Sequence, residues 1–289
     1  MPELPEVEVV KRSLTNKVQN SIVKAIKIND RKLRYKIDKN KIRKIIGLKI
    51  EKISRRSKFL LFYFNKKVVM LVHLGMTGKF FFLNRKNKKY KTSFYYNISE
   101  EKDKKHDRVI FDLSNNQKLI YNDIRKFGFI KLFNKNQLSK NLHLKKLGPE
   151  PLGKKFTFNY FKKYIIRKNR AIKETLMDQT FVSGLGNIYS NEILFLSKIR
   201  PTKKTKDLSE EEIKKVIKFT KKILSKAIRL GGSSIKNFSS GNGKQGLFQQ
   251  HFSVYGKKGE KCPNKTCKSN IIKIVIASRA SFYCPKCQK

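Results

Sequence analysis

Several residue types are scarce in this sequence, and each shortage excludes a class of protein. Tryptophan is absent, and only 21 Asp and Glu residues stand against 69 Lys and Arg, so the formal net charge is +48. No segment approaches the ~18–20 consecutive apolar residues that a membrane-spanning helix needs. The four cysteines all lie at or after Cys262, whereas a disulfide framework would distribute them along the chain. We therefore expect neither a membrane protein nor a disulfide-stabilised secreted protein.

The residues that are abundant indicate a folded protein that binds a polyanion. Hydrophobic residues make up 39% of the 289 positions and 21 residues are Phe, which argues against a disordered chain. The large positive charge favours nucleic acid as the partner, with an anionic membrane surface as the second choice. Abundant Lys, Ile and Asn are also typical of an AT-rich genome, so part of the charge is attributed to base composition. The acidic start, Met1 to Glu6, is unlike a signal peptide, and we expect a cytoplasmic protein.

The order of patterns along the chain predicts two domains joined near residue 150. Apolar residues from Val7 to Val18 predict a helix after the first prolines. Many short strands with regular turns then indicate a sandwich or barrel, and the strands are expected at 22–28, 59–64, 68–74, 79–83, 109–113, 118–121 and 127–133. Residues 84–107 are charged and weakly patterned, which favours a loop. The segment 147–153 holds two prolines and two glycines, which predicts a linker.

A helical pattern follows the linker. Ser209 and Glu212 have the spacing of a capping box, and apolar residues continue at helical spacing to Ile228. Gly231-Gly232 then suits a left-handed helix cap, and residues 233–246 form a loop rich in Gly, Ser and Asn. The predicted fold class is therefore α+β with two domains. We expect an N-terminal β-sandwich with flanking helices at 1–146, a linker at 147–153, a helical domain at 154–250 and a small hairpin at 251–289.

The four cysteines predict a metal site. Cys262 and Cys267 form one close pair and Cys284 and Cys287 a second, with residues 271–276 and 280–283 patterned as a hairpin between them. Two such pairs suit tetrahedral thiolate coordination of one structural Zn²⁺. Arg279 lies on the hairpin, so the metal would hold this basic residue in place.

The N-terminus allows two interpretations. If Met1 is removed, Pro2 becomes a secondary amine, whose pKa of ~7.7–8.0 leaves a useful fraction unprotonated at neutral pH. Such an amine can attack a sugar aldehyde carbon and form an iminium, with Glu3 within reach as a proton donor. Alternatively, Pro-Glu-Leu-Pro-Glu simply starts a helix, because proline and acidic residues suit a first turn. Taken alone, these residues favour the second interpretation.

The motifs taken together resemble the formamidopyrimidine-DNA glycosylase family. The matching pieces run in order over the whole chain: Met1-Pro-Glu-Leu-Pro-Glu-Val-Glu8, Arg56-Ser-Lys58, His73-Leu-Gly-Met-Thr-Gly78, His106-Asp-Arg-Val109, Tyr121-Asn-Asp-Ile-Arg-Lys-Phe-Gly128, Leu147-Gly-Pro-Glu-Pro-Leu152, Ala171-Ile-Lys173, Gly184-Leu-Gly-Asn-Ile-Tyr189 and Arg279-Ala-Ser-Phe-Tyr-Cys284. Three departures are visible, one of which is Ile124 in place of a frequent proline or alanine. The first cysteine pair has four intervening residues where two are usual, and Ser57 stands where glycine is common.

The resemblance implies a bifunctional DNA glycosylase and lyase that removes oxidised purines, such as 8-oxoguanine and formamidopyrimidines, and cleaves the strand by β,δ-elimination. It implies Pro2 as the Schiff-base nucleophile, Glu3 as the acid for base excision and Glu6 as its support. Lys58 would act in strand cleavage, and Arg279 would grip the phosphate beside the lesion. Zinc would take no part in the chemistry, and no nucleotide cofactor is implied.

The resemblance also implies how damaged double-stranded DNA is held by an enzyme that we expect to be a bacterial, nucleoid-associated monomer. Base removal requires the nucleotide to leave the stack, and Met76, Arg125 and Phe127 would fill the space that it vacates. Further DNA contacts would come from His106, Arg125, Lys168, Lys173 and Asn187. Residues 181–189 would form the turn of a helix-two-turn-helix motif, with the N-terminus of the following helix able to receive phosphate.

Three alternatives remain at this point. An endonuclease VIII-type glycosylase for oxidised pyrimidines shares Pro2, Glu3, Lys58 and the zinc hairpin, although Leu4 and the loop at 233–252 favour the purine branch. A non-catalytic, zinc-stabilised nucleic-acid-binding protein would not need Pro2, Glu3 and Lys58 together. A membrane-surface protein would need a basic amphipathic helix with an exposed aromatic face, whereas the apolar stripe at 209–230 is typical of a helix packed on a core.

Overall fold

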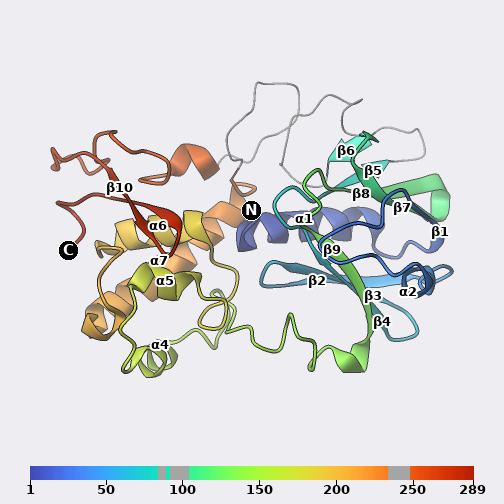
Figure 1. The fold of residues 1–289 in the computed structure, drawn as a ribbon, viewed down its shortest axis with the longest axis horizontal. Coiled ribbons are helices and arrows are strands. Elements are labelled where there is room, and N and C mark those ends of the chain that lie inside the picture. Colours follow the sequence, from blue (N-terminus) through green and yellow to red (C-terminus); the bar gives the residue numbers. More distant parts are fainter. Residues whose placement is uncertain (84–88, 92–103, 234–247) are drawn as a thin grey trace. The chain divides into compact units, whose positions relative to one another are not determined.

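The computed structural model describes residues 1–83, 89–91, 104–233 and 248–289, and shows two compact units (Figure 1). Unit 1 comprises Met1–Lys145 with Gly231–Leu247, and unit 2 comprises Lys146–Leu230 with Phe248–Lys289. Most of the two expected loops, 84–107 and 233–246, lies outside the described residues. Of the first, residues 89–91 form a short strand rather than a loop, because they pair with the end of a preceding strand.

Unit 1 begins with helix α1 (Leu4–Val18), whose buried face includes Val7, Val10, Leu14 and Val18. These residues recur every three or four positions, which places them on one side of a helix. A second short helix, α2 (Lys39–Arg43), is capped by the carboxylate of Asp38. The helix after the first prolines was predicted, but α2 was not, because a single apolar residue, Ile42, among four basic and polar ones shows no apolar periodicity.

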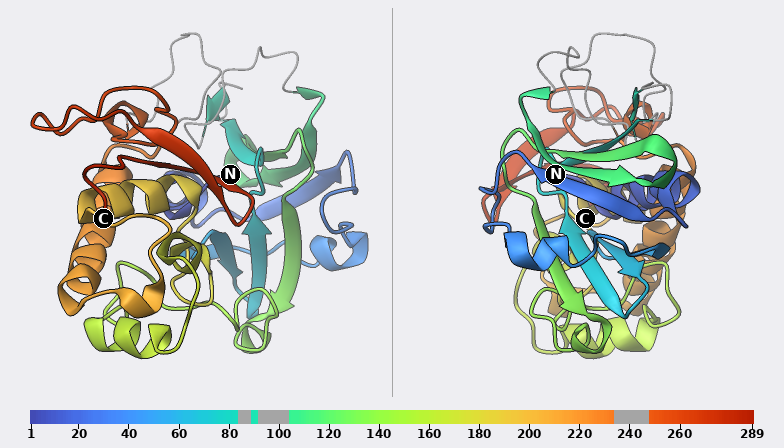
Figure 2. Two further views of the ribbon diagram at one scale, coloured as in Figure 1. Left: turned by 60° about the vertical axis from the view of Figure 1, so that its left-hand side comes forward. Right: turned by 90° about the vertical axis from the view of Figure 1, so that its right-hand side faces the viewer.

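Two antiparallel sheets form the body of unit 1 (Figure 2). The five-stranded sheet has the order β1-β7-β8-β5-β6, and the four-stranded sheet has the order β2-β3-β4-β9. The strands are β1 (Val23–Ile28), β2 (Ile50–Arg56), β3 (Phe59–Phe64), β4 (Val68–His73), β5 (Lys79–Leu83), β6 (Lys89–Lys91), β7 (Asp107–Leu113), β8 (Gln117–Asn122) and β9 (Phe129–Asn134). One apolar cluster joins α1 to residues of both sheets, including Phe62 and Phe80. The predicted β-sandwich with flanking helices is therefore confirmed.

Unit 2 combines helices with a small hairpin. Its helices are α4 (Phe158–Ile165), α5 (Ile172–Met177), α6 (Asn187–Ser197) and α7 (Glu210–Arg229), and its strands are β10 (Ile272–Ile276) and β11 (Arg279–Tyr283). The predicted capping box of α7 is present, since Ser209 Oγ accepts from Glu212 N at 3.2 Å and Glu212 Oε2 accepts from Ser209 N at 2.9 Å. After α7, Gly231 and Gly232 both have positive φ, 79° and 81°, as expected for a helix that ends in glycine.

The chain returns to unit 1 immediately after that cap. Residues 231–233 were expected to belong with the helices, whereas Ser233 donates from both its backbone N and its Oγ to Glu6 Oε1, at 2.9 and 3.0 Å. The φ of +81° at Gly232 and the 3.2 Å approach that a Cβ there would make to Glu6 Cγ explain why glycine occupies this position. This return therefore completes the surroundings of the N-terminal helix.

Candidate active site and nucleic-acid interface

The N-terminal residues form a buried polar cluster at the start of α1. Pro2 and Glu3 are buried, with Glu3 only 3% exposed, and Glu6 is 2% exposed. The Glu6 carboxylate accepts from Glu3 N at 2.9 Å through one oxygen and from Ser233 through the other. Two carboxylates thus lie beside the N-terminal amine, and one of them is held rigidly by hydrogen bonds from two segments of the chain.

The electrostatic surroundings of the amine include more than these carboxylates. Burial lowers the pKa of the Met1 amine below its ordinary value, Glu3 and Glu6 oppose that change, and the charges of Lys58 and Arg125 lower the pKa further. An amine with a lowered pKa is less protonated at neutral pH and hence more nucleophilic. The predicted residues Pro2, Glu3, Glu6 and Lys58 therefore all lie near the N-terminal amine in unit 1.

Lys58 is placed by a tight turn between β2 and β3. Arg56 pairs with Phe59 across these strands, so Ser57 and Lys58 alone form the turn, and Ser57 has a left-handed φ of 56°. Arg55 stabilises the turn, because its Nη1 donates to Ser57 O at 2.8 Å and its Nε donates to Glu8 Oε2 at 2.9 Å. The ammonium-bearing side chain of Lys58 is only 6% exposed.

The Glu8–Arg55 pair connects α1 with this turn. Burial raises the pKa of Glu8, but the hydrogen bond and charge of Arg55 outweigh burial and lower it overall. The carboxylate therefore stays charged at neutral pH. Glu8 also pairs with Lys11 and Arg12 on its own helix, at 3.2 and 3.1 Å. The connection orients α1, which directly follows Pro2 and Glu3, against the turn that carries Lys58.

His73 also belongs to this cluster, although the sequence analysis did not single it out. It ends β4 directly opposite Phe59, and its Nδ1 accepts from Gly75 N at 3.1 Å. Burial, reinforced by the nearby charges of Lys58 and Arg34, lowers the pKa of His73 to about 4. The ring is therefore neutral at physiological pH. The motif that begins at His73 was the only sequence signal for this residue.

Two loops of unit 1 carry the three residues predicted to enter the DNA stack. A Cβ at Gly75 would collide with the backbone of Phe127, so the two loops touch there, and the φ of +62° at Gly75 also requires glycine. Asp123 ties the loops together: its Oδ1 accepts from Thr77 Oγ1 at 2.5 Å and its Oδ2 from Gly128 N at 2.9 Å.

The predicted side chains lie at the tips of these loops. Phe127 is 45% exposed, and the Arg125 guanidinium carbon lies 4.6 Å from the centre of its ring. Met76 is half-buried on the neighbouring loop. His106 is also half-buried, and its Nδ1 lies 3.2 Å from Arg108 Nη2. The structure thus brings Met76, Arg125 and Phe127 to one exposed part of unit 1, as expected for an apolar wedge with a polar partner.

The four cysteines of unit 2 converge as predicted. Their Sγ atoms all lie within 4.8 Å of one another, with Cys262–Cys287 at 3.8 Å and Cys267–Cys284 at 3.6 Å. Thiolates bound to one tetrahedral Zn²⁺ would be about 3.8 Å apart, given a metal–sulfur distance of ~2.3 Å. The longer first loop therefore still delivers a donor set that fits zinc. The second pair continues into Gln288, whose amide contacts Cys284 N and Ile199 O.

The hairpin that carries Arg279 lies along α6 (Figure 2). Arg279 is exposed and begins β11 after a turn at Ala277 and Ser278, both of which have positive φ. Lys173 was predicted to contact phosphate. Its side chain points to β11, the strand that begins at Arg279. It is fully buried, and its Nζ donates to Ala280 O at 2.8 Å and to Ser281 Oγ at 2.6 Å.

Asn191 joins the same hairpin to the start of α6, and sequence reasoning missed it. Its Oδ1 accepts from Phe282 N at 2.7 Å, and its Nδ2 donates to Asn187 O at 2.5 Å. Asn187 is the first residue of α6, as predicted, and among the described residues its Oδ1 has no hydrogen-bond partner. Glu192 accepts from the backbone N of Ser253, Val254 and Tyr255, at 2.7, 3.0 and 2.9 Å. No sequence pattern marks an asparagine within a helix, so the contact between Asn191 and Phe282 could not have been predicted.

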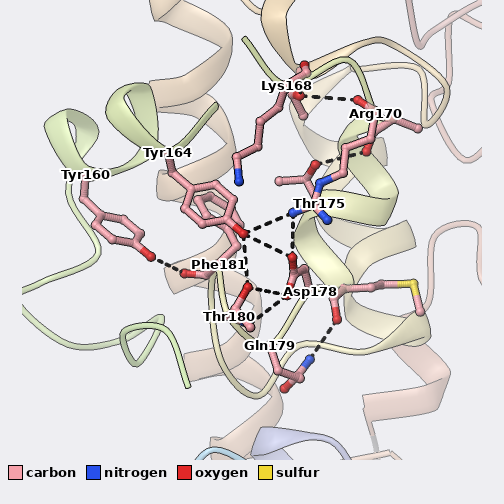
Figure 3. A network of polar contacts seen from close by, with 12 residues as sticks. Tyr160, Tyr164, Lys168, Arg170, Thr175, Asp178, Gln179, Thr180 and Phe181 are labelled. Carbon is pink, nitrogen blue, oxygen red and sulfur yellow. Dashed lines mark hydrogen bonds and ion pairs between the residues drawn. The ribbon is translucent and has the colours of Figure 1, made fainter. Parts of the chain in front are cut away.

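Lys168, another predicted DNA contact, lies in the connection between α4 and α5 (Figure 3). Its Nζ lies 3.6 Å from the centre of the Tyr164 ring. The Tyr164 hydroxyl in turn lies 3.1 Å from both Asp178 Oδ2 and Thr180 Oγ1, and accepts from Arg170 Nη2 at 3.2 Å. Besides the four cysteines, unit 2 therefore holds Arg279, Lys168, Lys173 and Asn187, whereas unit 1 holds the other residues predicted for catalysis and DNA contact.

Three consecutive regions of the chain match the domains of one family. Residues 1–130 match the formamidopyrimidine-DNA glycosylase N-terminal domain, residues 147–239 the formamidopyrimidine-DNA glycosylase H2TH domain, and residues 259–289 the zinc finger found in FPG and IleRS. Curated relatives include formamidopyrimidine-DNA glycosylase of Rickettsia bellii, 42% identical over 100% of both chains. The protein of the same name in Rickettsia felis is 41% identical over 100% of this chain and 98% of its own.

The similarity to solved structures agrees with these sequence matches. A Lactococcus lactis Fpg variant bound to DNA containing Fapy-dG superposes with a TM-score of 0.85, at 35% identity and over 100% of both chains. The Lactococcus lactis Fpg bound to DNA with an abasic site has a TM-score of 0.84 at the same identity, over 99% of both chains. The matches define a class, the DNA glycosylases of base excision repair that carry a zinc finger. The chain belongs to the formamidopyrimidine-DNA glycosylase family.

Family membership confirms several expectations at once. The resemblance, the α+β fold, the glycosylase class and one structural zinc are all confirmed, the last by the matched zinc finger and the converging cysteines. DNA is the partner, as the complexes of the structural relatives with damaged DNA support. Within the described residues, no helix is both long and apolar enough to cross a membrane. The roles of individual residues are taken up next as proposals.

Proposed function

We propose that this chain removes oxidised purines from DNA with the amine of Pro2 as nucleophile and then cleaves the strand by β,δ-elimination. The observation that carries the proposal is the N-terminal cluster: an amine beside Glu3 and Glu6, within electrostatic range of Lys58, at the buried start of α1. Removal of Met1 would leave Pro2 as the terminal amine of this cluster.

The cluster supplies a group for each step. The Pro2 nitrogen attacks the sugar carbon that bears the base, and the base departs with a proton from Glu3. The nitrogen then loses its own proton, and the bond from this carbon to the ring oxygen of the sugar opens, with protonation of that oxygen, to give an iminium. The resulting iminium acidifies the neighbouring sugar C–H, so that a base removes this proton and the 3′ phosphate leaves. A second elimination releases the 5′ phosphate, and water then frees Pro2. Glu6, fixed by Ser233 and by Glu3 N, positions the amine and its water, and Lys58 assists the eliminations.

The other predicted residues would hold the DNA. We propose that Met76, Arg125 and Phe127 occupy the space of the extruded nucleotide, because the first and last provide apolar area and the arginine provides donors for the unpaired base. His106, Lys168, Asn187 and Arg279 would contact the backbone. The burial of Lys173 against Ala280 and Ser281 favours an indirect role, in which it supports the strand of Arg279.

The proposal extends to the setting in which the enzyme works. We propose a monomer that acts on damaged double-stranded DNA in the bacterial cytoplasm, at the nucleoid. Zn²⁺ would be held by Cys262, Cys267, Cys284 and Cys287 and would stabilise the hairpin that bears Arg279, with no part in the reaction. The charge of +48 would make binding strongly dependent on salt concentration.

A borohydride trap tests the proposal. The purified protein is mixed with a duplex that carries one 8-oxoguanine opposite cytosine, reduced with borohydride and digested, and the cross-linked peptide is located by mass spectrometry. We expect a covalent adduct at the nitrogen of Pro2. An adduct formed only with an oxidised pyrimidine would reassign the substrate, and DNA binding with no adduct on either duplex would leave a non-catalytic binding protein.

A further inference from the structure

Tyr164 is surrounded by an unusually complete set of hydrogen-bonding partners, which we call the Tyr164 network: Tyr164, Arg170, Asp178 and Thr180 (Figure 3). The hydroxyl contacts all three other members. The ring packs on Phe181, with centroids 4.5 Å apart. Both ends of this side chain are therefore fixed, and one face of the ring is covered by the ammonium of Lys168.

The backbone of Lys168 is fixed as well. Its N donates to Ile165 O at 2.9 Å, and its O accepts from Thr205 Oγ1 at 2.8 Å. The preceding residue, Arg167, has a left-handed φ of 61°, so the chain turns sharply between α4 and Lys168. Lysine side chains normally lose much rotamer freedom when they bind, and this loss opposes binding. In this structure the Lys168 ammonium already lies over the face of the Tyr164 ring.

The charges of the network leave Lys168 available to an anion. Burial would raise the pKa of Asp178, but hydrogen bonds from Thr180 and Arg170 lower it to about 2. The ionised carboxylate pairs with Arg170 Nη2 at 2.6 Å and accepts from Thr180 N at 2.8 Å. Among the described residues, Lys168 forms no ion pair. Arg170 thus neutralises the carboxylate of the network, and this carboxylate does not compensate the charge of Lys168.

We propose that Tyr164 is a positioning residue: it holds the Lys168 ammonium where it can contact a backbone phosphate of DNA, and the rest of the Tyr164 network fixes the ring. The inference rests on the proposed DNA contact of Lys168. Tyr164 itself need not touch DNA. Its contribution is preorganisation, because an ammonium held over an aromatic face searches fewer conformations before it binds.

The test measures binding of a duplex with a tetrahydrofuran abasic analogue over a range of salt concentrations. Lys168→Ala should lower the slope of log K against log salt by about 0.9, the value for one phosphate contact. Tyr164→Leu should weaken binding about threefold to tenfold, but it should add nothing to Lys168→Ala in the double variant. Tyr164→Phe keeps the ring and its packing on Phe181 but loses the hydroxyl contacts, so its affinity should lie between those of the wild type and Tyr164→Leu.

Tyr160 provides the matched control. It lies on the same helix, stacks on the same Phe181 and donates its hydroxyl to Phe181 O at 2.7 Å. Tyr160→Leu should lower thermal stability, and whatever it does to binding should add to the effect of Lys168→Ala. Zinc content and circular dichroism report folding, and Tyr164→Met, which keeps side-chain bulk without an aromatic face, replaces Tyr164→Leu if that variant unfolds.

The outcomes separate the two levels of the proposal. An unchanged salt slope in Lys168→Ala would show that Lys168 does not contact phosphate, and both the contact and the role of Tyr164 would be lost. A lowered slope with additive effects of Tyr164→Leu and Lys168→Ala would overturn the role of Tyr164 alone. Equal losses in Tyr164→Phe and Tyr164→Leu would likewise overturn the ring contact. The borohydride trap on the wild-type protein tests the chemistry at Pro2 separately, so a failure of either level here is distinguishable from a failure of the proposed reaction.

Discussion

The Pro2 end of unit 1 and the Arg279 hairpin of unit 2 are held in place by different means. Pro2 lies just before α1, a 15-residue helix that packs on the apolar core of a two-sheet body. Arg279 begins a strand of a two-stranded sheet, and small sheets of this kind are marginal without other support. That support comes from buried polar side chains, Lys173 and Asn191, together with a metal site.

The contrast shows where each site should be vulnerable. A nucleophile at the end of a helix anchored by an apolar core depends on the chemical state of one nitrogen. A hairpin anchored by hydrogen bonds depends on each buried donor and acceptor, because an unsatisfied buried polar group costs about 1–3 kcal/mol.

Blocking the terminal nitrogen should abolish activity while leaving unit 1 folded. A cleavable peptide extension ahead of Pro2 converts its amine into an amide, which cannot form an iminium. We expect a loss of strand cleavage of about 10³-fold or more in single-turnover assays. Proteolytic removal of the extension, which regenerates the free Pro2 amine, is the control and should restore cleavage. Full activity with the extension in place would contradict the assignment of Pro2.

Asn191→Leu should loosen the hairpin without removing a metal ligand. The substitution leaves Phe282 N and Asn187 O without their side-chain partner, and we expect a loss of about 1–3 kcal/mol in the free energy of unfolding. Denaturant unfolding and DNA affinity measure the effect. Ser190→Ala is the control: Ser190 is equally buried, and within the described part of the chain its Oγ has no hydrogen-bond partner. Equal behaviour of the two variants would show that polar anchoring is unimportant here.

Acid should weaken unit 1 through His73. Its pKa is lowered to about 4 in the fold from an ordinary 6.5. The contribution of the neutral ring to the free energy of unfolding is therefore complete above pH 6.5 and is lost as the pH falls toward 4. A shift of this size corresponds to at most ~3 kcal/mol, and about 1–3 kcal/mol is expected for a side chain that keeps some contact with water.

The matched variants for this pH dependence are His73→Gln and His143→Gln. The first should flatten the dependence of unfolding free energy between pH 6.5 and 4. The second should flatten it less, because His143 is more exposed, although burial together with Lys131 and Arg34 also lowers its pKa. Identical pH profiles for wild type and His73→Gln would contradict the predicted coupling.

Glycine in the hairpin turn should give the smallest effect, a stabilisation. Ala277 and Ser278 form a two-residue turn with φ of 48° and 59°, a geometry that favours glycine or asparagine. Ser278→Gly should add about 0.5–1 kcal/mol to the free energy of unfolding. Ser57→Gly, in the corresponding turn of unit 1 with φ of 56°, should give a similar gain. Destabilisation by both would show that side-chain contacts outweigh backbone strain.

Sequence patterns predicted the elements whose stability is local or strongly apolar. The limits of β3 and β5 matched the expectation, because Phe59–Phe64 and Lys79–Leu83 are almost wholly apolar. The strand β2 escaped notice, because this edge strand buries only Ile50 and Ile53 among charged residues. Its hydrogen bonds to β3, which no local pattern reveals, make it a strand.

The residues of the candidate site also differ in whether the sequence could predict them. The residues proposed for chemistry were found because they lie in contiguous motifs. The environment of Lys173 could not be predicted, because its partner Ser281 lies 108 residues away and a lysine among 69 Lys and Arg carries no sign of burial. Tyr164 and Asn191 were missed for the same reason: their partners are defined by tertiary packing.

The contact between Glu6 and Ser233 also has a consequence for how the protein is made. These residues are 227 positions apart, and a ribosome that adds ~5–20 residues per second needs roughly 11–45 s to reach the second after the first. During that interval the Glu6 carboxylate lacks its hydrogen bonds from Ser233 and can accept only from Glu3 N. The order of synthesis thus leaves a period in which a processing enzyme can reach Met1 before the surroundings of the amine are complete.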